Sequence, residues 1–167
     1  FKAPLAHECL YPEVALIDPE LTLSMPRFVT ACTGLDALAH AVEGYWSKNH
    51  QPICDVLALE AAALIVENLP RVLGDGTDIE ARSAMCRAAL LAGMAFQIPK
   101  NAAVHACSYP LSNKYHLSHG AACAMTLDHF MRFNSDAMAE RGATLARAAG
   151  FADLNRFADA IAELKAI

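Results

Sequence analysis

The 167-residue sequence lacks several features that define other classes of protein. No apolar run reaches the roughly 18 residues that a membrane-spanning helix needs. A formal net charge of −5 leaves no basic surface for nucleic acid or anionic lipid. No two cysteines have the Cys-x-x-Cys spacing of zinc knuckles and thioredoxin-type sites. With 55% hydrophobic residues, the sequence instead predicts a soluble globular domain with a sizeable core, and neither a nucleic-acid nor a membrane partner.

The chain also begins without an initiator methionine, a basic leader or a signal-like apolar stretch. We therefore interpret it as a processed or truncated part of a longer protein. Disulfide frameworks belong to short, core-poor secreted domains, so the cysteines predict mostly buried, reduced thiols in the cytoplasm. There are six of them: Cys9, Cys32, Cys54, Cys86, Cys107 and Cys123.

The first 22 residues differ in pattern from the rest of the chain. The segment from Tyr11 to Pro19 is a short apolar run closed by a proline, which predicts a β-strand. A strand needs neighbours, and no second strand pattern follows it. We interpret residues 1–22 as the end of a sheet domain that lies upstream.

From Ser24 onward, apolar residues recur at helical spacing and predict an all-α helical bundle over residues 23–167. Pro70 is expected to end the second helix, and Thr77 with Glu80 to form a capping box at the start of the third. Helices are expected at 26–46, 55–69, 77–97, 102–111, 119–134, 137–149 and 154–167. The fold class is an all-α bundle behind a short N-terminal strand.

Asp36 and His40 stand four residues apart in the first predicted helix, where such a pair projects from one face. Both side chains can reach one ion, although an Asp–His hydrogen bond or two solvated residues is the commoner outcome for an isolated pair. The apolar neighbours favour burial, which a carboxylate tolerates only with partners or a metal. His105 and His119 follow later, and three imidazoles with one carboxylate suit Fe(II) or Zn(II).

Two segments resemble the signatures of the iron-containing (group III) alcohol dehydrogenases. Residues 33–45, TGLDALAHAVEGY, resemble the first signature. The stretch 104–120, with histidines fourteen positions apart, resembles the second. The motifs at 18–21 and 25–26 and the segment DHFMRFN at 128–134 extend the resemblance over nearly the whole chain.

The resemblance implies a metal site of one carboxylate and three imidazoles: Asp36, His40, His105 and His119. The ion implied is Fe(II), with Zn(II) as the other candidate. Residues 1–22 would be the remnant of a nucleotide-binding α/β domain, and residues 23–167 a helical metal-binding catalytic domain that is truncated at its C-terminus. NAD or NADP would be bound mainly by the missing upstream domain.

The activity implied is metal-assisted hydride transfer between NAD(P) and the carbon of a small alcohol or aldehyde. The enzyme would be a cytoplasmic homo-oligomer, and this chain alone would be inactive. The ion would act as a Lewis acid on the substrate oxygen, while the protein supplies geometry and a dry site between two domains.

The chain departs from the family four residues after His105, where many members carry a histidine assigned to proton relay. Tyr109 stands there, and a tyrosine with its pKa of about 10 is a poorer relay at neutral pH. Either Tyr109 relays the proton, or another histidine does, or the proton leaves through water and the cofactor ribose. His116, between the predicted ligands, is the second candidate. The change also favours a polar or anionic aldehyde as substrate.

Two other functions stay open. A sugar-phosphate cyclase or lyase resembling dehydroquinate synthase combines similar domains, but it has Glu in the first helix, so Asp36 and His40 favour the dehydrogenase. This chain on its own would also be consistent with a non-catalytic helical module, in which the Asp–His cluster only holds the helices of the bundle together.

Overall fold

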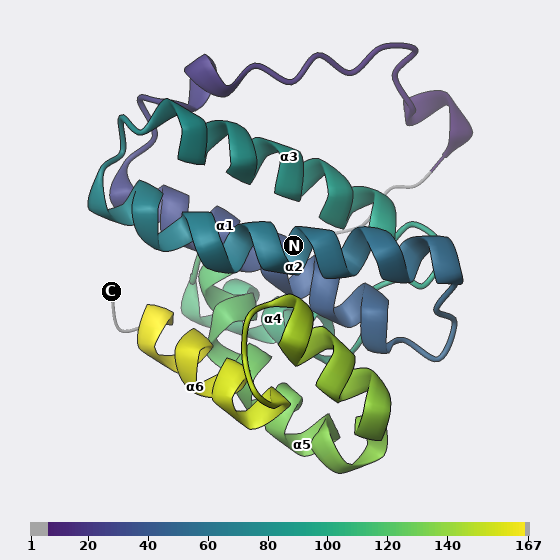
Figure 1. The fold of residues 1–167 in the computed structure, drawn as a ribbon. Helices are drawn as coiled ribbons and strands as arrows, with labels where there is room; N and C mark the ends of the chain where they lie inside the picture. The colour runs from purple at the N-terminus through teal and green to yellow at the C-terminus, as the bar shows by residue number, and fades with distance from the viewer. Residues whose placement is uncertain (1–6, 166–167) are drawn as a thin grey trace.

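The structure is a computed structural model that describes residues 7–165, and its ribbon consists of helices and connecting loops (Figure 1). Two short 3-10 turns precede six α-helices within these residues. The elements are η1 Glu8–Leu10, η2 Pro19–Thr22, α1 Arg27–Trp46, α2 Pro52–Gly74, α3 Ile79–Ala95, α4 Ala103–Tyr115, α5 His119–Ala148 and α6 Leu154–Lys165. The predicted all-α bundle is confirmed.

The strand predicted at 11–19 is wrong. This segment is an extended arm that passes along α3 and ends in η2 (Figure 1). Val14 and Leu16 are 81% and 90% exposed. A strand needs a neighbour to satisfy its backbone hydrogen bonds, and residues 7–165 form no other strand. The first six residues of the predicted remnant lie outside the described part of the chain.

One helix continues through a proline that was expected to end it, and another runs beyond its predicted end. The helix α2 runs past Pro70 to Gly74, so its predicted end at Leu69 is wrong. The helix α4 likewise contains Pro110 and extends to Tyr115. An internal proline removes one helical hydrogen bond and crowds the preceding turn. In α2 the turn after the proline buries Val72 and Leu73, and this packing offsets that cost.

Other helix ends also differ from the expectation for local reasons. The cap of α3 is Asp78, whose carboxylate accepts a hydrogen bond from the Ala81 backbone at 3.0 Å, so the capping box at Thr77 is wrong. The two helices predicted over 119–149 are the two parts of α5, and the break between them lies at the non-helical residue Ala139, with φ 41° and ψ −117°, instead of at 135–136.

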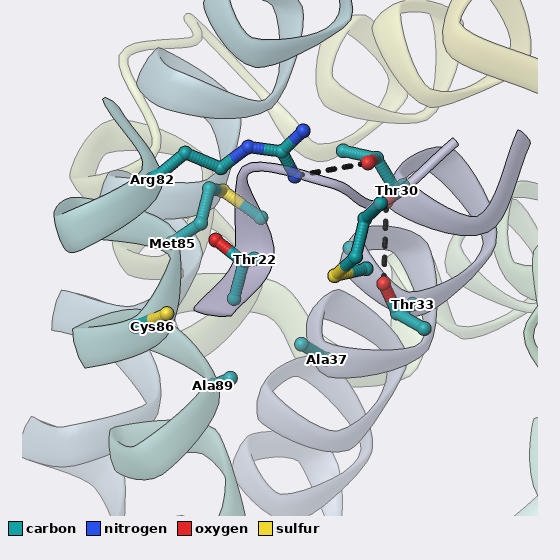
Figure 2. A pocket seen from close by; sticks show the side chains of 10 residues that line it. Thr22, Thr30, Thr33, Ala37, Arg82, Met85, Cys86 and Ala89 are labelled. Carbon is teal, nitrogen blue, oxygen red and sulfur yellow. Dashed lines mark hydrogen bonds between the residues drawn. The ribbon is translucent and has the colours of Figure 1, made fainter. Parts of the chain in front are cut away.

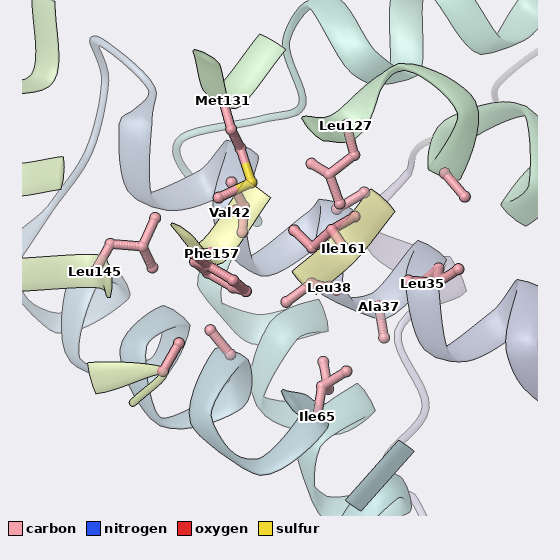
Figure 3. Packing of buried hydrophobic residues seen from close by; sticks show 14 of the residues in the cluster. Leu35, Ala37, Leu38, Val42, Ile65, Leu127, Met131, Leu145, Phe157 and Ile161 are labelled. Atoms are coloured by element: carbon pink, nitrogen blue, oxygen red, sulfur yellow. The ribbon is translucent and has the colours of Figure 1, made fainter. Parts of the chain in front are cut away.

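The helix α1 is the centre of the bundle. It packs against α2 and α3 on one side and against α5 on the other. Twelve of its twenty residues are buried, so apolar residues surround its axis instead of forming one stripe. Figure 3 shows side chains from four helices meeting in the core, among them Leu38, Val42, Ile65, Leu127, Phe157 and Ile161. Polar residues on α1 therefore project from a helix that its neighbours α2, α3 and α5 hold in place.

A pocket of about 250 Å³ lies between η2, α1 and α3 (Figure 2). The buried Arg82 guanidinium spans its edge, and donates to the Thr30 hydroxyl and to the Gly76 carbonyl, each at 3.0 Å. These bonds tie the loop between α2 and α3 to α1. None of the predicted metal ligands lines this pocket.

All six cysteines are free thiols, as predicted. Within residues 7–165, no helix has the length and apolar character needed to cross a membrane.

Candidate metal centre

The structure brings the four predicted metal ligands together around the Asp36 carboxylate. Asp36 and His40 lie on successive turns of α1, and His40 Nε2 is 4.0 Å from Asp36 Oδ2. The Nε2 atoms of His105, on α4, and His119, at the start of α5, lie 3.4 Å and 3.7 Å from Asp36 Oδ1. The same nitrogen of each imidazole therefore faces one carboxylate.

The other ring nitrogen of each histidine is engaged by a neighbouring side chain. His40 Nδ1 lies 3.0 Å from Asn101 Oδ1, and its ring stacks on Phe96 with centroids 4.2 Å apart. His119 Nδ1 lies 3.3 Å from the Ser108 hydroxyl. A partner on Nδ1 fixes the tautomer and the ring orientation, which leaves Nε2 as the metal-binding nitrogen.

Glu43 provides the corresponding partner for His105. Its side chain is fully buried, and Oε2 accepts a hydrogen bond from His105 Nδ1 at 2.7 Å. Oε1 accepts from the Val104 backbone at 2.7 Å, and Ala102, which precedes α4, makes no side-chain cap of its own. The Glu43 carboxylate thus caps α4 from another helix and orients a predicted ligand, as carboxylate–histidine pairs do at metal sites.

Sequence reasoning had not singled out Glu43. The available signal is its spacing, because residues 36, 40 and 43 fall on one face of α1.

Gly120 allows α5 to approach α1 closely enough to place His119. A Cβ atom at Gly120 would lie only 2.0 Å from the carbonyl oxygen of Cys32 on α1. No other residue fits this contact without moving one of the two backbones. The glycine therefore sets the distance between the helix that carries Asp36 and the helix that carries His119.

Two buried atoms in the cluster have no hydrogen-bond partner: Asp36 Oδ1 and His105 Nε2. Buried polar atoms without a partner are costly and rare in folded proteins. A divalent cation between these atoms would give both of them a partner. One carboxylate and neutral imidazoles are donors that Fe(II) and Zn(II) accept, so the residues present fit such an ion.

The charges and contacts within the cluster shift the pKa values of Asp36, His40 and His105. Burial alone would raise the pKa of Asp36, but the contact with His105 and the charges of the nearby histidines outweigh burial and lower it. Burial, followed by the charge of His105, lowers the pKa of His40. Burial would also lower the pKa of His105, but its contacts with Asp36, Cys123 and Glu43 raise it to about 11. A metal ion at this centre must displace that proton.

Cys123 is a further member of the cluster that sequence reasoning had counted only as a buried thiol. One ligand atom from each of four residues lies within 4.8 Å of the others: Asp36, His105, His119 and Cys123. The sulfur of Cys123 is 3.8 Å from His119 Nε2, and the residue is fully buried. His40 adjoins Asp36 but lies outside this tightest group. The missed signal is that Cys123 follows His119 by four residues, which places both on one helix face.

The two predicted proton-relay residues lie in different places. The ring of Tyr109 is nearly parallel to that of His119, at 17°, with centroids 6.4 Å apart, and Tyr109 is partly exposed. His116 ends α4 in a left-handed conformation with φ 57° and is exposed. Tyr109 therefore borders the cluster, whereas His116 is not among the residues that form it.

The fold and the cluster together are those of a helical metal-binding domain, and comparison with known proteins identifies its family. Residues 30–167 match the model of the "Fe-containing alcohol dehydrogenase family, C-terminal". The chain belongs to this family and covers its C-terminal helical domain, which confirms the resemblance.

Individual relatives agree with this assignment. The chain is 40% identical over 149 residues to the NAD-dependent methanol dehydrogenase of Bacillus methanolicus. The matched region covers 89% of this chain and 39% of that protein. The chain is 42% identical over 139 residues to the 1,3-propanediol dehydrogenase of Klebsiella pneumoniae, covering 83% of this chain and 36% of that protein.

A solved structure matches almost the whole chain. The sulfoacetaldehyde reductase of Bifidobacterium kashiwanohense, in complex with NAD+, superposes with a TM-score of 0.96 at 48% identity, covering 99% of this chain and 44% of that one. The chain thus spans less than half the length of these relatives. These relatives favour the dehydrogenase over the cyclase or lyase.

Proposed function

We propose that the protein is a metal-dependent alcohol dehydrogenase or aldehyde reductase that transfers hydride between NAD(P) and an alcohol carbon, and that this chain supplies its metal site. The observation that carries the proposal is the convergence of three Nε2 atoms on Asp36, with each Nδ1 engaged elsewhere. Family membership supports it, as do relatives named for alcohol oxidation and aldehyde reduction.

Each side chain of the centre has a separate task in this reaction. When bound, Fe(II) or Zn(II) supplies Lewis-acid polarisation of the substrate oxygen during hydride transfer. Asp36 and the three imidazoles hold the ion and balance part of its charge. Glu43 and Asn101 keep the rings of His105 and His40 in the ligating orientation, so little reorganisation is needed when the ion binds.

We assign the proton relay to Tyr109. Its ring lies against that of His119, and its partial exposure gives a proton a path to solvent. A hydroxyl both donates and accepts hydrogen bonds, which a relay requires. His116 is the second candidate, and its exposed place at the end of α4 supports it less.

Within the class of small alcohols and aldehydes, we propose a polar or anionic aldehyde as substrate. The 48%-identical relative is named a sulfoacetaldehyde reductase, and its substrate carries a sulfonate. A tyrosine hydroxyl beside the cluster can donate a hydrogen bond to such a group. Comparing reduction of sulfoacetaldehyde and propionaldehyde by the protein that carries this chain tests this point, and equal efficiency for both would contradict it.

The remaining features follow from the same proposal. Residues 1–22 would belong to an upstream nucleotide-binding domain that holds most of the NAD(P), with residues 23–167 as the catalytic domain. Exposed apolar side chains such as Leu16 and Phe133 support contacts with another domain or a second copy in a homo-oligomer. The free thiols support a cytoplasmic location.

The proposal is tested by replacing His119 with alanine in the protein that carries this chain. We expect loss of both the bound Fe(II) or Zn(II) and the NADH-dependent reduction of an aldehyde. The control is His129→Ala, which removes an exposed histidine from the same helix and should retain both. Full activity of the His119 variant would refute the assignment, and metal binding without turnover in the unaltered protein would favour the non-catalytic module.

A further inference from the structure

The imidazole of His40 is fixed by two neighbouring rings and by one hydrogen bond. Its ring stacks on that of Phe96, with centroids 4.2 Å and planes 13° apart, and the centroid of the His105 ring lies 4.3 Å away. At the ring edge, Nδ1 lies 3.0 Å from Asn101 Oδ1. An amide oxygen can only accept a hydrogen bond, so Nδ1 carries the hydrogen and Nε2 keeps a lone pair for an ion.

Phe96 and Asn101 lie at the two ends of one short segment. Residues 96–101, which we call the His40 loop, connect the end of α3 to the residue that precedes α4. Within the loop, the Lys100 backbone N–H donates to the Phe96 carbonyl at 2.8 Å. Because both groups that hold the His40 ring come from this loop, the orientation of the ring depends on the conformation of the loop.

Ser47 fastens the His40 loop to the helix that carries His40. It is the residue that ends α1, and its backbone N–H donates to the Glu43 carbonyl at 3.0 Å. Its hydroxyl donates to the carbonyl of Pro99, a buried residue in the middle of the loop, at 2.8 Å. A serine that is not one of the predicted metal ligands therefore holds the loop against α1.

Lys100 has a backbone conformation that a lysine seldom adopts. Its φ is 64°, in the left-handed region, and its side chain is exposed. Such a residue persists only where the surrounding structure enforces it. The Ser47–Pro99 and Lys100–Phe96 hydrogen bonds supply that restraint. Because Lys100 directly precedes Asn101, its backbone angles determine where the amide oxygen of Asn101 points.

We propose that the His40 loop positions the metal ligand His40, and that Ser47 and the left-handed backbone of Lys100 are the two features that hold the loop in its working conformation. The inference rests on the proposed function only in requiring that the cluster binds a metal. Ser47 and Lys100 are positioning residues, because they act on the ion through Asn101, Phe96 and His40. A ring that is already oriented loses less freedom when the ion binds, which raises metal affinity.

Three substitutions of Lys100 test the role of its backbone: Lys100→Gly, Lys100→Asn and Lys100→Val. All three remove the same ammonium group, but glycine and asparagine adopt the left-handed region readily and valine does not. We expect the protein that carries this chain to keep its Zn(II) affinity, measured by competition with a chromophoric chelator, in the glycine and asparagine variants. The valine variant should lose about 10–100-fold, as when the outer partner of a ligand is removed.

The matched control is Lys48→Val, which replaces another exposed lysine without a left-handed backbone and should leave the Zn(II) affinity unchanged. An equal loss in all three Lys100 variants would show that the ammonium matters and not the backbone, and would overturn the proposal. Unchanged affinity in Lys100→Val would overturn it as well.

Ser47 provides a second and independent test. Ser47→Ala should weaken Zn(II) binding by about 10-fold or more, and Ser47→Thr, which keeps the hydroxyl, should restore it. The 15N resonances of the imidazoles in the Zn(II)-loaded protein locate the change. In Ser47→Ala, Nε2 of His40 should lose its metal-bound shift, whereas those of His105 and His119 should keep theirs.

The outcomes separate this inference from the proposed function. If the unaltered protein binds Zn(II) and Ser47→Ala binds it equally well, the role of the loop is refuted and the metal site stands. If all three histidines lose their metal-bound shifts together, the loop does not act through His40. If the unaltered protein binds no Zn(II), both the metal site and the role of the loop are refuted.

Discussion

Replacing Glu43 by glutamine tests how the helices build the metal centre. The change keeps the shape of the side chain, removes its charge and replaces one acceptor oxygen by an NH2 donor. In the native chain the two carboxylate oxygens serve the Val104 backbone and the His105 ring, each at 2.7 Å. The single amide oxygen of glutamine can serve one of these donors but not both.

The size of the effect follows from these bonds. A hydrogen bond to a charged group contributes about 1.5–3 kcal/mol, and a buried donor left without an acceptor costs about 1–3 kcal/mol. Because relief of the buried charge offsets part of this loss, we expect the free energy of unfolding of the metal-free chain to fall by about 1.5–3 kcal/mol. Loss of the carboxylate behind His105 should also weaken Zn(II) binding by about 10–100-fold.

Two measurements check this prediction: urea unfolding of the metal-free chain, and Zn(II) affinity by competition with a chromophoric chelator. The control is Glu67→Gln, which removes an exposed carboxylate from α2 and should change stability by no more than about 0.5 kcal/mol. If Glu43→Gln matches this control in both measurements, Glu43 neither caps α4 nor orients His105.

Three further substitutions test the packing that positions the site. Gly120→Ala should cost about 3 kcal/mol in urea unfolding, at the upper end of overpacking costs, and abolish Zn(II) binding, because its Cβ would meet the α1 backbone at 2.0 Å; near-native stability would contradict the close approach. Gly93→Ala, inside α3 with no atom within 4 Å of the new Cβ, should instead raise the midpoint of thermal unfolding and add about 0.5–1 kcal/mol. Phe157→Ala, at a fully buried core position, should cost about 3–5 kcal/mol, and a loss below 1 kcal/mol would show that the core is wrongly described.

The parts of the molecule that were predictable from sequence depend on local patterns. Apolar periodicity gave the helices, and the spacing of Asp36 and His40 indicated one face and one ion. The N-terminal strand was wrong because a short apolar run has no conformation of its own without a partner strand. The end of α2 was wrong because packing beyond Pro70 outweighs the local effect of the proline.

The rest of the site depends on contacts between distant parts of the chain. Glu43 acts on His105, which is 62 residues away, and no local pattern reports such a pair. The same holds for Gly120, whose neighbour on α1 is known only once the helices are packed. Cys123 is an intermediate case, because its spacing from His119 is visible in the sequence but its distance from Asp36 is a tertiary property.

The most direct test of the central claim is anomalous diffraction at the zinc absorption edge, measured on crystals of this chain grown with one equivalent of Zn(II). The account predicts a single peak about 2.0–2.2 Å from an Asp36 carboxylate oxygen and from the Nε2 atoms of His40, His105 and His119. A peak at any other place on the chain, or none at these side chains, would contradict it.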